Sequence, residues 1–476
     1  MELTWDGLEG NGFDPQLQKL NQLLERATAE GEVPGAVAVV AQRGRVLLHR
    51  AYGSAQLTPR VEPMHVTTLF DLASLTKVVA TAPAVLCLAE EGVLRLQDRV
   101  AHFIPEFSGD QKEQVDLRHL LTHCSGLPAW RPFYKSASTP EAVLAAVCAT
   151  PLEFPVGRHF QYSDLGFILL GEVVRRASGK SLDSFVRERL FEPLGMRDTR
   201  FCPPADAAPR CAATEVQEGI PIRGRVHDEN AFAMGGVAGH AGLFSTAADL
   251  AVFCQMLLNG GEYGGVRVLS PLGVRAMLAP QSPCSGGARG FGFDLNSAYA
   301  SVRGDLLPTG SAGHSGFTGT SIWIDRDLEL FIVLLTNAVH PTRDRPAIRL
   351  RSRVSNVVAA SLDASAAVIP DRVRDPVHVA LGVDVLRDTG CACLAGASVG
   401  LVTNHTGRTS DGTPTLDVLL QAGVAVKALF SPEHGIAGVA DELLSSQRDE
   451  RSGLPVYSLY GETKRPLPEW LSGIDT

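Results

Sequence analysis

The chain has no block of basic residues. Its 43 Lys and Arg side chains are outnumbered by 52 Asp and Glu side chains, which gives a formal net charge of −9 at pH 7. A protein that binds nucleic acid through the phosphate backbone needs a basic surface, so this charge balance argues against a nucleic-acid partner. The composition leaves the oligomeric state open.

Long apolar runs are also missing. None reaches the roughly 20 residues that a membrane-spanning helix needs, so we expect no membrane-spanning segment. The N-terminus, Met1-Glu2-Leu3-Thr4-Trp5-Asp6, lacks the basic and apolar regions of a signal peptide. The sequence as written therefore predicts a cytoplasmic protein, whereas a start site further upstream would allow a signal peptide and a periplasmic or cell-envelope location.

Cysteine pairs at the spacing of disulfide scaffolds or zinc sites are absent, although the chain has 9 cysteines. Most are expected to be free thiols in apolar surroundings. Cys391-Ala392-Cys393 has a single residue between its thiols, which is too few for the usual metal or redox motifs. The others are Cys87, Cys124, Cys148, Cys202, Cys211, Cys254 and Cys284.

One polar cluster offers groups that suit a divalent cation. It comprises His227-Asp228-Glu229-Asn230 and the later His240. The spacing is not a zinc signature, and adjacent charged residues in a glycine-rich stretch are more often a hydrogen-bonded or substrate-facing loop. We expect no metal and no other cofactor.

The chain has ample apolar residues for folded domains. At 476 residues, with 45% hydrophobic and 20% charged residues, it reads as a globular protein of two domains. Apolar periodicity predicts a helix over 15–30, two strands over 35–52 around Arg43-Gly44, and a helix from 74 to 91 bent at Pro83. Residues 93–240 read as mostly helix and loop, and 321–324 and 330–335 as an antiparallel strand pair. We expect an α+β fold: an antiparallel sheet with flanking helices beside an all-helical lobe, with the catalytic groups where the lobes meet.

Ser74-Leu75-Thr76-Lys77 stands at the start of the second of these helices. Residues at i and i+3 of a helix face the same way, so the amine of Lys77 is expected within reach of the Ser74 hydroxyl. If burial lowers the pKa of Lys77, its amine can take the hydroxyl proton and make Ser74 a nucleophile for acyl transfer. Taken alone, the same letters fit a helix-capping serine followed by a solvated lysine.

Three further segments agree with the nucleophile hypothesis: His119 to Pro128, Phe160-Gln161-Tyr162-Ser163-Asp164, and Gly313-His314-Ser315-Gly316-Phe317-Thr318-Gly319. In this order, together with Phe191 to Met196 and Gly239 to Thr246, they resemble the serine β-lactamase and penicillin-binding-protein superfamily, in its class C-like branch of esterases and D-amino-acid peptidases. The resemblance covers most of residues 15–345 and implies the β-lactamase/transpeptidase-like fold.

The resemblance also implies roles. Ser74 would be acylated, with Lys77 and the phenol of Tyr162 sharing the proton transfers, and which of them holds the proton at each step stays open. The backbone N–H groups of Ser74 and Phe317 would form the oxyanion hole. Gly316 would let a substrate backbone approach a strand edge. A buried core tyrosine is the alternative interpretation of Tyr162.

Two substrate-binding positions depart from the lactamase pattern. His314, in His314-Ser315-Gly316, replaces the lysine of Lys-Thr-Gly and removes a permanent positive charge, and Asp164 adds a negative one. Both changes weaken recognition of a β-lactam or D-Ala carboxylate, so we expect an esterase, an amidase or a D-amino-acid peptidase. If His314 carries charge, activity on carboxylate-bearing substrates should follow the imidazole titration near a pKa of about 6.5.

The composition changes near residue 365. Residues 368–376 read as a linker between a hydrolase domain over 1–365 and a second domain over 371–476, where strands at 398–402 and 424–430 alternate with a helix at 413–421. This predicts a partial, Rossmann-like parallel α/β unit. The phrases Gly400 to Gly407, Phe430 to Gly435 and Leu454 to Gly461 resemble the N-terminal part of the exo-β-N-acetylmuramidase family. In that comparison Glu433, followed by His434, would be a general acid at the carboxyl end of a strand.

Three function classes remain open. The first is a serine hydrolase acting on a peptidoglycan-derived or D-amino-acid ester or amide, with a small molecule or a muropeptide as its substrate. The second is a muramic-acid glycosidase in a longer protein. The third is a penicillin-binding-like protein that has lost catalysis, against which the complete set of Ser74, Lys77 and Tyr162 argues.

Overall fold

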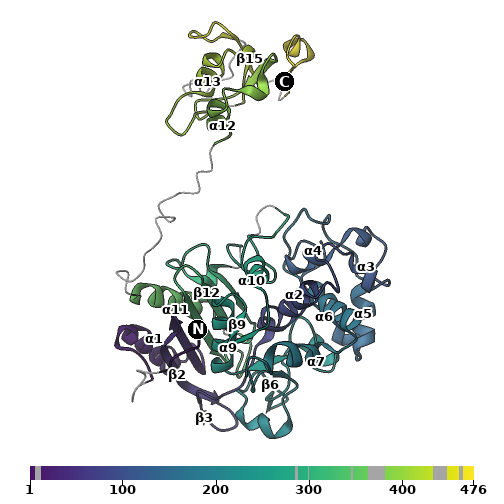
Figure 1. The fold of residues 1–476 in the computed structure, drawn as a ribbon, viewed down its shortest axis with the longest axis vertical. Coiled ribbons are helices and arrows are strands. Elements are labelled where there is room, and N and C mark those ends of the chain that lie inside the picture. Colours follow the sequence, from purple (N-terminus) through teal and green to yellow (C-terminus); the bar gives the residue numbers. More distant parts are fainter. Residues whose placement is uncertain are drawn as a thin grey trace. The chain divides into compact units, whose positions relative to one another are not determined.

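The computed structural model describes residues 1–5, 12–284, 288–297, 300–344, 347–362, 381–432, 447–459 and 465–475. The chain divides into two compact units, Met1–Ile369 and Pro370–Thr476 (Figure 1). The linker proposed at 368–376 lies outside the described residues, and so do Glu433 and His434.

One antiparallel sheet of six strands, in the order β3-β2-β1-β13-β12-β11, organises the first unit. The strands predicted at 35–52 and at 321–335 are confirmed as its central members. The strand bounds are β1 Gly35–Gln42, β2 Arg45–Gln56, β3 Glu62–Pro63, β11 Ala312–Ser315, β12 Ser321–Asp325 and β13 Leu330–Thr336.

Helices cover both faces of this sheet. The side chains of β1 alternate: Val37 and Val39 join the core under the helical lobe, while Ala38 and Val40 face the opposite layer. That opposite layer is made by α1 (Gln18–Ala29), which follows a short 3-10 turn at Pro15–Leu17, and by α11 (Ile348–Ser361). Figure 1 shows these two helices side by side, and α9 (Ala247–Leu258) packs on β1 and β13 from the other face.

The helix predicted from residue 74 is three successive helical forms. A 3-10 turn (Ala73–Leu75) leads into a π-helical turn (Lys77–Thr81) and then into α2 (Ala82–Glu90), with Pro83 in the first turn of α2 rather than in mid-helix. Together they make an apolar run of 18 residues, Ala73–Glu90, so the prediction that no run is long enough to cross a membrane is wrong by length. Because most of the run is buried inside the first unit, it is a core helix.

The helical lobe contains short strands as well as helices, so the prediction of an all-helical lobe is wrong in this detail. A small sheet in the order β4-β8-β5 runs beneath the nucleophile segment, and two short hairpins, β6/β7 and β9/β10, lie elsewhere in the unit. The bounds are α3 Val100–Phe103, α4 Leu117–Leu121, α5 Pro140–Ala149, α6 Asp164–Ser178, α7 Leu182–Val186, α8 Glu229–Ala233, α10 Pro271–Met277, β4 Phe70–Asp71, β5 Arg200–Phe201, β6 Val216–Gln217, β7 Ile220–Pro221, β8 Leu243–Ser245, β9 Glu262–Tyr263 and β10 Val266–Arg267.

A disulfide bond joins Cys124 and Cys284, which are 160 positions apart in the sequence. The spacing of the cysteines did not predict this bond. The other seven cysteines are free thiols, five of them buried, which confirms the prediction for most of the set.

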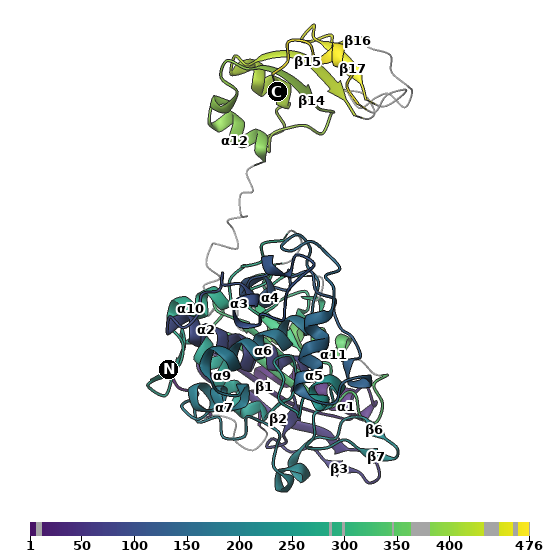
Figure 2. The same cartoon turned by 90° about the vertical axis from the view of Figure 1, so that its right-hand side faces the viewer.

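The second unit carries a parallel sheet with one antiparallel edge, in the order β14-β15-β17-β16 (Figure 2). Its elements are α12 Gly382–Asp388, β14 Ser398–Val402, α13 Thr415–Gln421, β15 Ala425–Ser431, β16 Gln447–Arg448 and β17 Pro455–Ser458. The predicted alternation of strand, helix and strand is therefore confirmed, and the fold class is α+β with an appended α/β unit.

Candidate active site

Ser74 follows a strained turn. Ala73 has φ of +46°, in the left-handed region that residues other than glycine rarely adopt. The turn is held by the side chain of Asp71, whose Oδ1 accepts a hydrogen bond from the Ala73 N–H at 2.9 Å. This geometry leaves Ser74 half-buried at the first turn of the helical run.

Lys77 is completely buried and its ammonium group is surrounded by oxygen atoms. Its Nζ donates to Ser74 Oγ at 3.0 Å and to the backbone carbonyl of His240 at 3.0 Å. It also forms an ion pair with Asp164 Oδ1 at 2.7 Å. The predicted contact of the amine with the serine hydroxyl is therefore present.

The pKa of Lys77 moves in the direction opposite to the one that burial alone predicts. Burial pushes the pKa of Lys77 down, as expected from the sequence. The charge of Asp164, and then the phenol of Tyr162, outweigh burial through Coulombic attraction and hydrogen bonds, so the pKa of Lys77 is raised above its ordinary value. This direction favours the ammonium form of Lys77, which has no electron pair with which to accept the Ser74 proton.

Tyr162 lies in the segment that leads into α6 and is enclosed by aromatic and cationic groups. Its ring centroid is 4.6 Å from that of His123 and 5.9 Å from that of His314. The Lys77 ammonium lies 5.1 Å from the ring centroid, and the buried guanidinium of Arg289 lies 5.6 Å from it. Arg289 therefore brings a permanent positive charge close to Tyr162 from a segment that sequence reasoning did not single out.

The two histidines beside Tyr162 are uncharged. Burial lowers the pKa of His123 and of His314 well below the ordinary value, and the positive charges of Arg289 and Lys77 lower both further. This direction argues against the hypothesis that His314 carries charge for substrate binding, which stays a prediction for the pH profiles of activity. His314 instead donates from Nδ1 to the carbonyl of Ser315 at 2.8 Å, and this carbonyl fixes its tautomer. His123 lies within the segment from His119 to Pro128, but only the tertiary fold reveals the contact of its ring with the ring of Tyr162.

Asp164 is placed by the start of α6. Ser163 is the N-cap, with its Oγ accepting from the Gly166 N–H at 3.3 Å and donating to the Pro128 carbonyl at 2.7 Å. The Asp164 N–H donates to the Ala129 carbonyl at 2.9 Å. Its carboxylate is thereby presented to Lys77, and the added negative charge expected from the sequence is paired rather than free.

The strand β11 brings His314 and Ser315 to the same site. The following loop, 316–320, packs against residues 71–72, because Thr318 Oγ1 donates to the Asp71 carbonyl at 2.7 Å. A Cβ atom at Gly316 would lie 2.2 Å from Thr320 Oγ1 and 2.4 Å from the Leu72 carbonyl oxygen. The close approach that requires glycine here is therefore made by the protein's own backbone, and not by a substrate as the sequence suggested.

Phe317 follows Gly316, and its ring is 61% exposed. Among the described residues, neither the N–H of Phe317 nor the N–H of Ser74 has a hydrogen-bond acceptor. Two unpaired backbone donors on adjacent segments are the arrangement that an oxyanion hole needs.

The polar cluster considered as a metal site is divided between two pairs. His240 Nε2 lies 2.9 Å from Asp228 Oδ1, and His227 Nε2 lies 3.3 Å from Glu215 Oε2. Within the described residues no three His, Cys, Asp or Glu side chains come together in a way that would hold a metal ion. The Asp228–His240 pair instead supports the carbonyl that accepts from Lys77.

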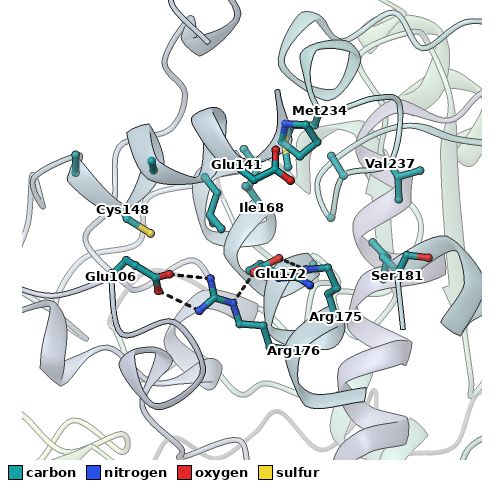
Figure 3. A pocket seen from close by; sticks show the side chains of 18 of the residues that line it. Glu106, Glu141, Cys148, Ile168, Glu172, Arg175, Arg176, Ser181, Met234 and Val237 are labelled. Carbon is teal, nitrogen blue, oxygen red and sulfur yellow. Dashed lines mark hydrogen bonds and ion pairs between the residues drawn. The ribbon is translucent and has the colours of Figure 1, made fainter. Parts of the chain in front are cut away.

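A cavity of about 830 Å³ opens elsewhere in the helical lobe, between α5, α6 and α7 (Figure 3). Its charged wall is internally paired, since Arg176 binds Glu106 through two hydrogen bonds of 3.0 Å and also contacts Glu172. None of Ser74, Lys77 and Tyr162 lines this cavity. It is a separate feature of the lobe.

Comparison with known proteins assigns both units. The family model described as Beta-lactamase matches residues 20–355, and the model described as Exo-beta-N-acetylmuramidase NamZ, N-terminal, matches residues 399–476. An N-acetylmuramyl-L-alanine amidase of Bacillus subtilis (strain 168) is 34% identical over 364 residues, which cover 68% of this chain and 81% of the relative. A protein of Escherichia coli (strain K12), whose name proposes a D-alanyl-D-alanine carboxypeptidase, is 32% identical, with 71% and 86% covered. The crystal structure of a family VIII carboxylesterase superposes with a TM-score of 0.60 at 25% identity, covering 74% of this chain and 98% of that one.

Proposed function

Since the chain belongs to the β-lactamase family and is a hydrolase of its penicillin-binding-protein-like kind, we propose that it cleaves an ester or amide through an acyl-enzyme formed on Ser74. The observation that carries this proposal is the contact of Ser74 Oγ with the buried Lys77 ammonium, beside Tyr162. It joins a hydroxyl, a fixed positive charge and a second proton-carrying oxygen in one site.

Tyr162 is the proposed proton acceptor. Because Lys77 is an ammonium ion, it stabilises negative charge on Ser74 Oγ and on the Tyr162 oxygen rather than taking a proton itself. With Tyr162 as the phenolate, Ser74 attacks the carbonyl carbon while its proton passes to the phenolate oxygen, and the phenol formed on Tyr162 then returns that proton to the leaving alcohol or amine. Water attacks the acyl-enzyme by the same proton route, which releases the acid and regenerates Ser74.

The N–H groups of Ser74 and Phe317 are the proposed oxyanion donors. Both are unpaired among the described residues, so neither has to break a hydrogen bond when charge develops on the substrate oxygen. His314, Ser315 and Gly316 would then form the edge along which the substrate lies.

The proposed substrate is a peptidoglycan fragment or a related D-amino-acid ester or amide. Two similar proteins are named for cleaving such bonds, and the appended unit matches a muramidase family. A neutral imidazole at His314 and a paired carboxylate at Asp164 add no net charge for a substrate carboxylate to meet. These features favour an amide or ester whose contacts with this edge are uncharged.

The test is a hydrolysis screen of the full chain against D-Ala-D-Ala peptides, muropeptides, p-nitrophenyl acetate and nitrocefin, with Ser74→Ala and Ser361→Ala. Ser74→Ala should lose fluorophosphonate labelling and at least about 10⁴-fold in turnover. Ser361, which donates to the Val357 carbonyl on α11, is the control and should behave as wild type. Substantial turnover in purified Ser74→Ala would rule out Ser74 as the nucleophile. Labelling by a penicillin probe without turnover of any substrate would favour the catalytically silent alternative.

A second candidate function is exo-β-N-acetylmuramidase activity, favoured by the match over residues 399–476. The substrate for the test is the p-nitrophenyl glycoside of N-acetylmuramic acid. If Ser74→Ala releases p-nitrophenol from it and Glu433→Gln does not, the result would support muramidase activity. Release that depends on Ser74 would contradict it.

A further inference from the structure

Asp71 links three segments of the site although its carboxylate contacts no substrate-facing side chain. Its side chain is buried, and within the described residues it forms no ion pair, so its two oxygens are satisfied by backbone N–H groups. We propose that Asp71 is the positioning residue of the oxyanion hole, holding the N–H of Ser74 and the N–H of Phe317 in place together. This inference rests on the proposed function.

The hydrogen bond from the Ala73 N–H to Asp71 orients the N–H of Ser74. Asp71 Oδ1 accepts from the Ala73 N–H at 2.9 Å and so maintains the left-handed conformation at Ala73. The next peptide unit carries the Ser74 N–H, and its direction depends on that conformation. Without the carboxylate oxygen, the strained turn loses the hydrogen bond that compensates for its conformation.

Two further hydrogen bonds of Asp71, from Thr318 and from His227, fix the position of Phe317. The Asp71 carbonyl accepts from Thr318 Oγ1 at 2.7 Å, which ties the residue after Phe317 to the nucleophile segment. Asp71 Oδ2 accepts from the His227 N–H at 2.7 Å. The His227 ring in turn stacks on the Phe317 ring at 5.9 Å with an interplanar angle of 19°. The position of Phe317 is therefore fixed by its neighbour Thr318 and by the stacking of its ring on His227. Both of these residues are hydrogen-bonded to Asp71.

The need for two hydrogen-bond acceptors explains why an aspartate is required in spite of its buried position. Burial is the main influence on Asp71 and raises the pKa of its carboxyl group, while the N–H groups of His227 and Ala73 oppose this, and the nearby Asp228 charge adds to it. An asparagine would place an NH₂ group where one oxygen now accepts a backbone N–H. One of the two bonds would then become a contact between two donors.

The kinetic test compares Asp71→Asn with Thr318→Val, which removes only the link to the Asp71 carbonyl, and with Asp249→Asn. Asp249 is a matched control, because its carboxyl group is also partly buried with a raised pKa and accepts from the Asp198 N–H at 2.9 Å and Thr199 Oγ1 at 2.8 Å, and it contacts neither Ala73 nor His227. Asp71→Asn should lower kcat by roughly 10- to 100-fold, within the effect of losing an oxyanion donor, with KM changed much less. Thr318→Val should lower kcat by about 2- to 10-fold, the effect of one hydrogen bond, and Asp249→Asn should leave kcat unchanged.

Phenylboronic acid separates positioning from general damage. Its boron adds to the serine oxygen and presents a tetrahedral oxygen to the oxyanion donors, so its affinity for each variant should fall by the same factor as kcat/KM. A fall in kcat with unchanged boronate affinity, or wild-type kinetics in Asp71→Asn, would overturn the proposal. If Asp71→Asn does not fold, Thr318→Val gives the same comparison.

Amide hydrogen exchange provides a readout that does not depend on turnover. Asp71→Asn should speed exchange in peptides covering 72–76 and 316–318 together, and Asp249→Asn should speed neither. If the wild-type chain hydrolyses nothing, or if Ser74→Ala remains active, the proposed function fails while this measurement still decides the role of Asp71. Unchanged exchange in both peptides would show that Asp71 does not position them.

Discussion

The neutrality of His123 and His314 makes the first unit sensitive to acid. Both pKa values are lowered well below the ordinary 6.5, chiefly by burial and then by the charges of Arg289 and Lys77. On unfolding, each imidazole returns to water and binds a proton near pH 6.5. Above pH 6.5 each histidine is neutral in both states, so the folded protein keeps its full stability. As the pH falls from 6.5 toward the lowered pKa of the folded state, only the unfolded state binds the proton, and the folded state loses stability. Each histidine should therefore cost at most about 1.4 kcal/mol per pH unit below 6.5, or at most about 2 kcal/mol between pH 7 and pH 5.

The perturbation is His314→Asn, because the asparagine NH₂ can replace the Nδ1–H that donates to Ser315 without introducing a titrating group. Urea unfolding of the full chain at pH 7, 6 and 5, followed by tryptophan fluorescence, measures the free energy of unfolding, with buried Trp323 on β12 reporting the main sheet. His314→Asn should lose less free energy of unfolding than wild type over this interval, by at most about 2 kcal/mol. His102→Asn is the control, since the His102 side chain is exposed, and it should follow wild type.

Equal pH dependence in wild type and His314→Asn would refute the reasoning, because it would mean that His314 titrates alike in the folded and unfolded states. The same neutrality predicts that the pH profiles of kcat/KM for an anionic and a neutral ester coincide between pH 6 and 8. Profiles that separate around pH 6.5 would show a charged His314 in the resting enzyme.

Three further changes test the site and the boundary of the first unit. Asp164→Asn removes the charge 2.7 Å from Lys77, so the pKa of Lys77 should fall and kcat/KM should drop by about 10- to 100-fold, with a pH profile shifted from that of wild type; an unchanged profile would contradict the ion pair. Gly316→Ala places a methyl group 2.4 Å from the Leu72 carbonyl and should cost about 1–3 kcal/mol of stability as well as activity, whereas Gly310→Ala, with open space around its Cβ, should cost little in either urea unfolding or turnover. A chain ending near residue 367 should keep full ester hydrolysis, and trypsin should remove residues 371–476 before it cuts the hydrolase unit; lost activity or a resistant tail would place that segment within the first domain.

Local patterns in the sequence predict the main elements of the fold. The apolar stripe of 15–30 and the strand pairs around Arg43-Gly44 and Asp325-Arg326-Asp327 depend on neighbours in the chain, and the structure has them as expected. The change from 3-10 to π to α geometry between Ala73 and Glu90 leaves no such signature. It arises where the segment packs against His240 and Gly239, more than 150 positions away. The bond between Cys124 and Cys284 was missed for the same reason.

In the site, too, the sequence predicts the contacts between neighbours in the chain and misses the effects of residues that only the fold brings together. The spacing of Ser74 and Lys77 predicts their contact because one helical turn sets it. The protonation of Lys77 depends on Asp164, at the start of α6, and on Tyr162, in the segment before it, so burial alone gave the wrong direction. Burial and then the charge of Arg289 lower the pKa of His314, and no local sequence motif identifies Arg289 as a neighbour of the site.

The order of strands in the main sheet has a consequence for how the chain folds. The central pair joins β1 to β13, with Ala36 opposite Thr336, so 300 positions separate partners that lie at the middle of the core. Pairs so distant in sequence form slowly, because the intervening chain must be brought together before the contact stabilises anything. During synthesis at about 5–20 residues per second, the β1–β2 hairpin waits roughly 15–60 s for its second neighbour. Until then its apolar edge is unpaired, so the nascent chain is most open to aggregation before residue 336 emerges from the ribosome.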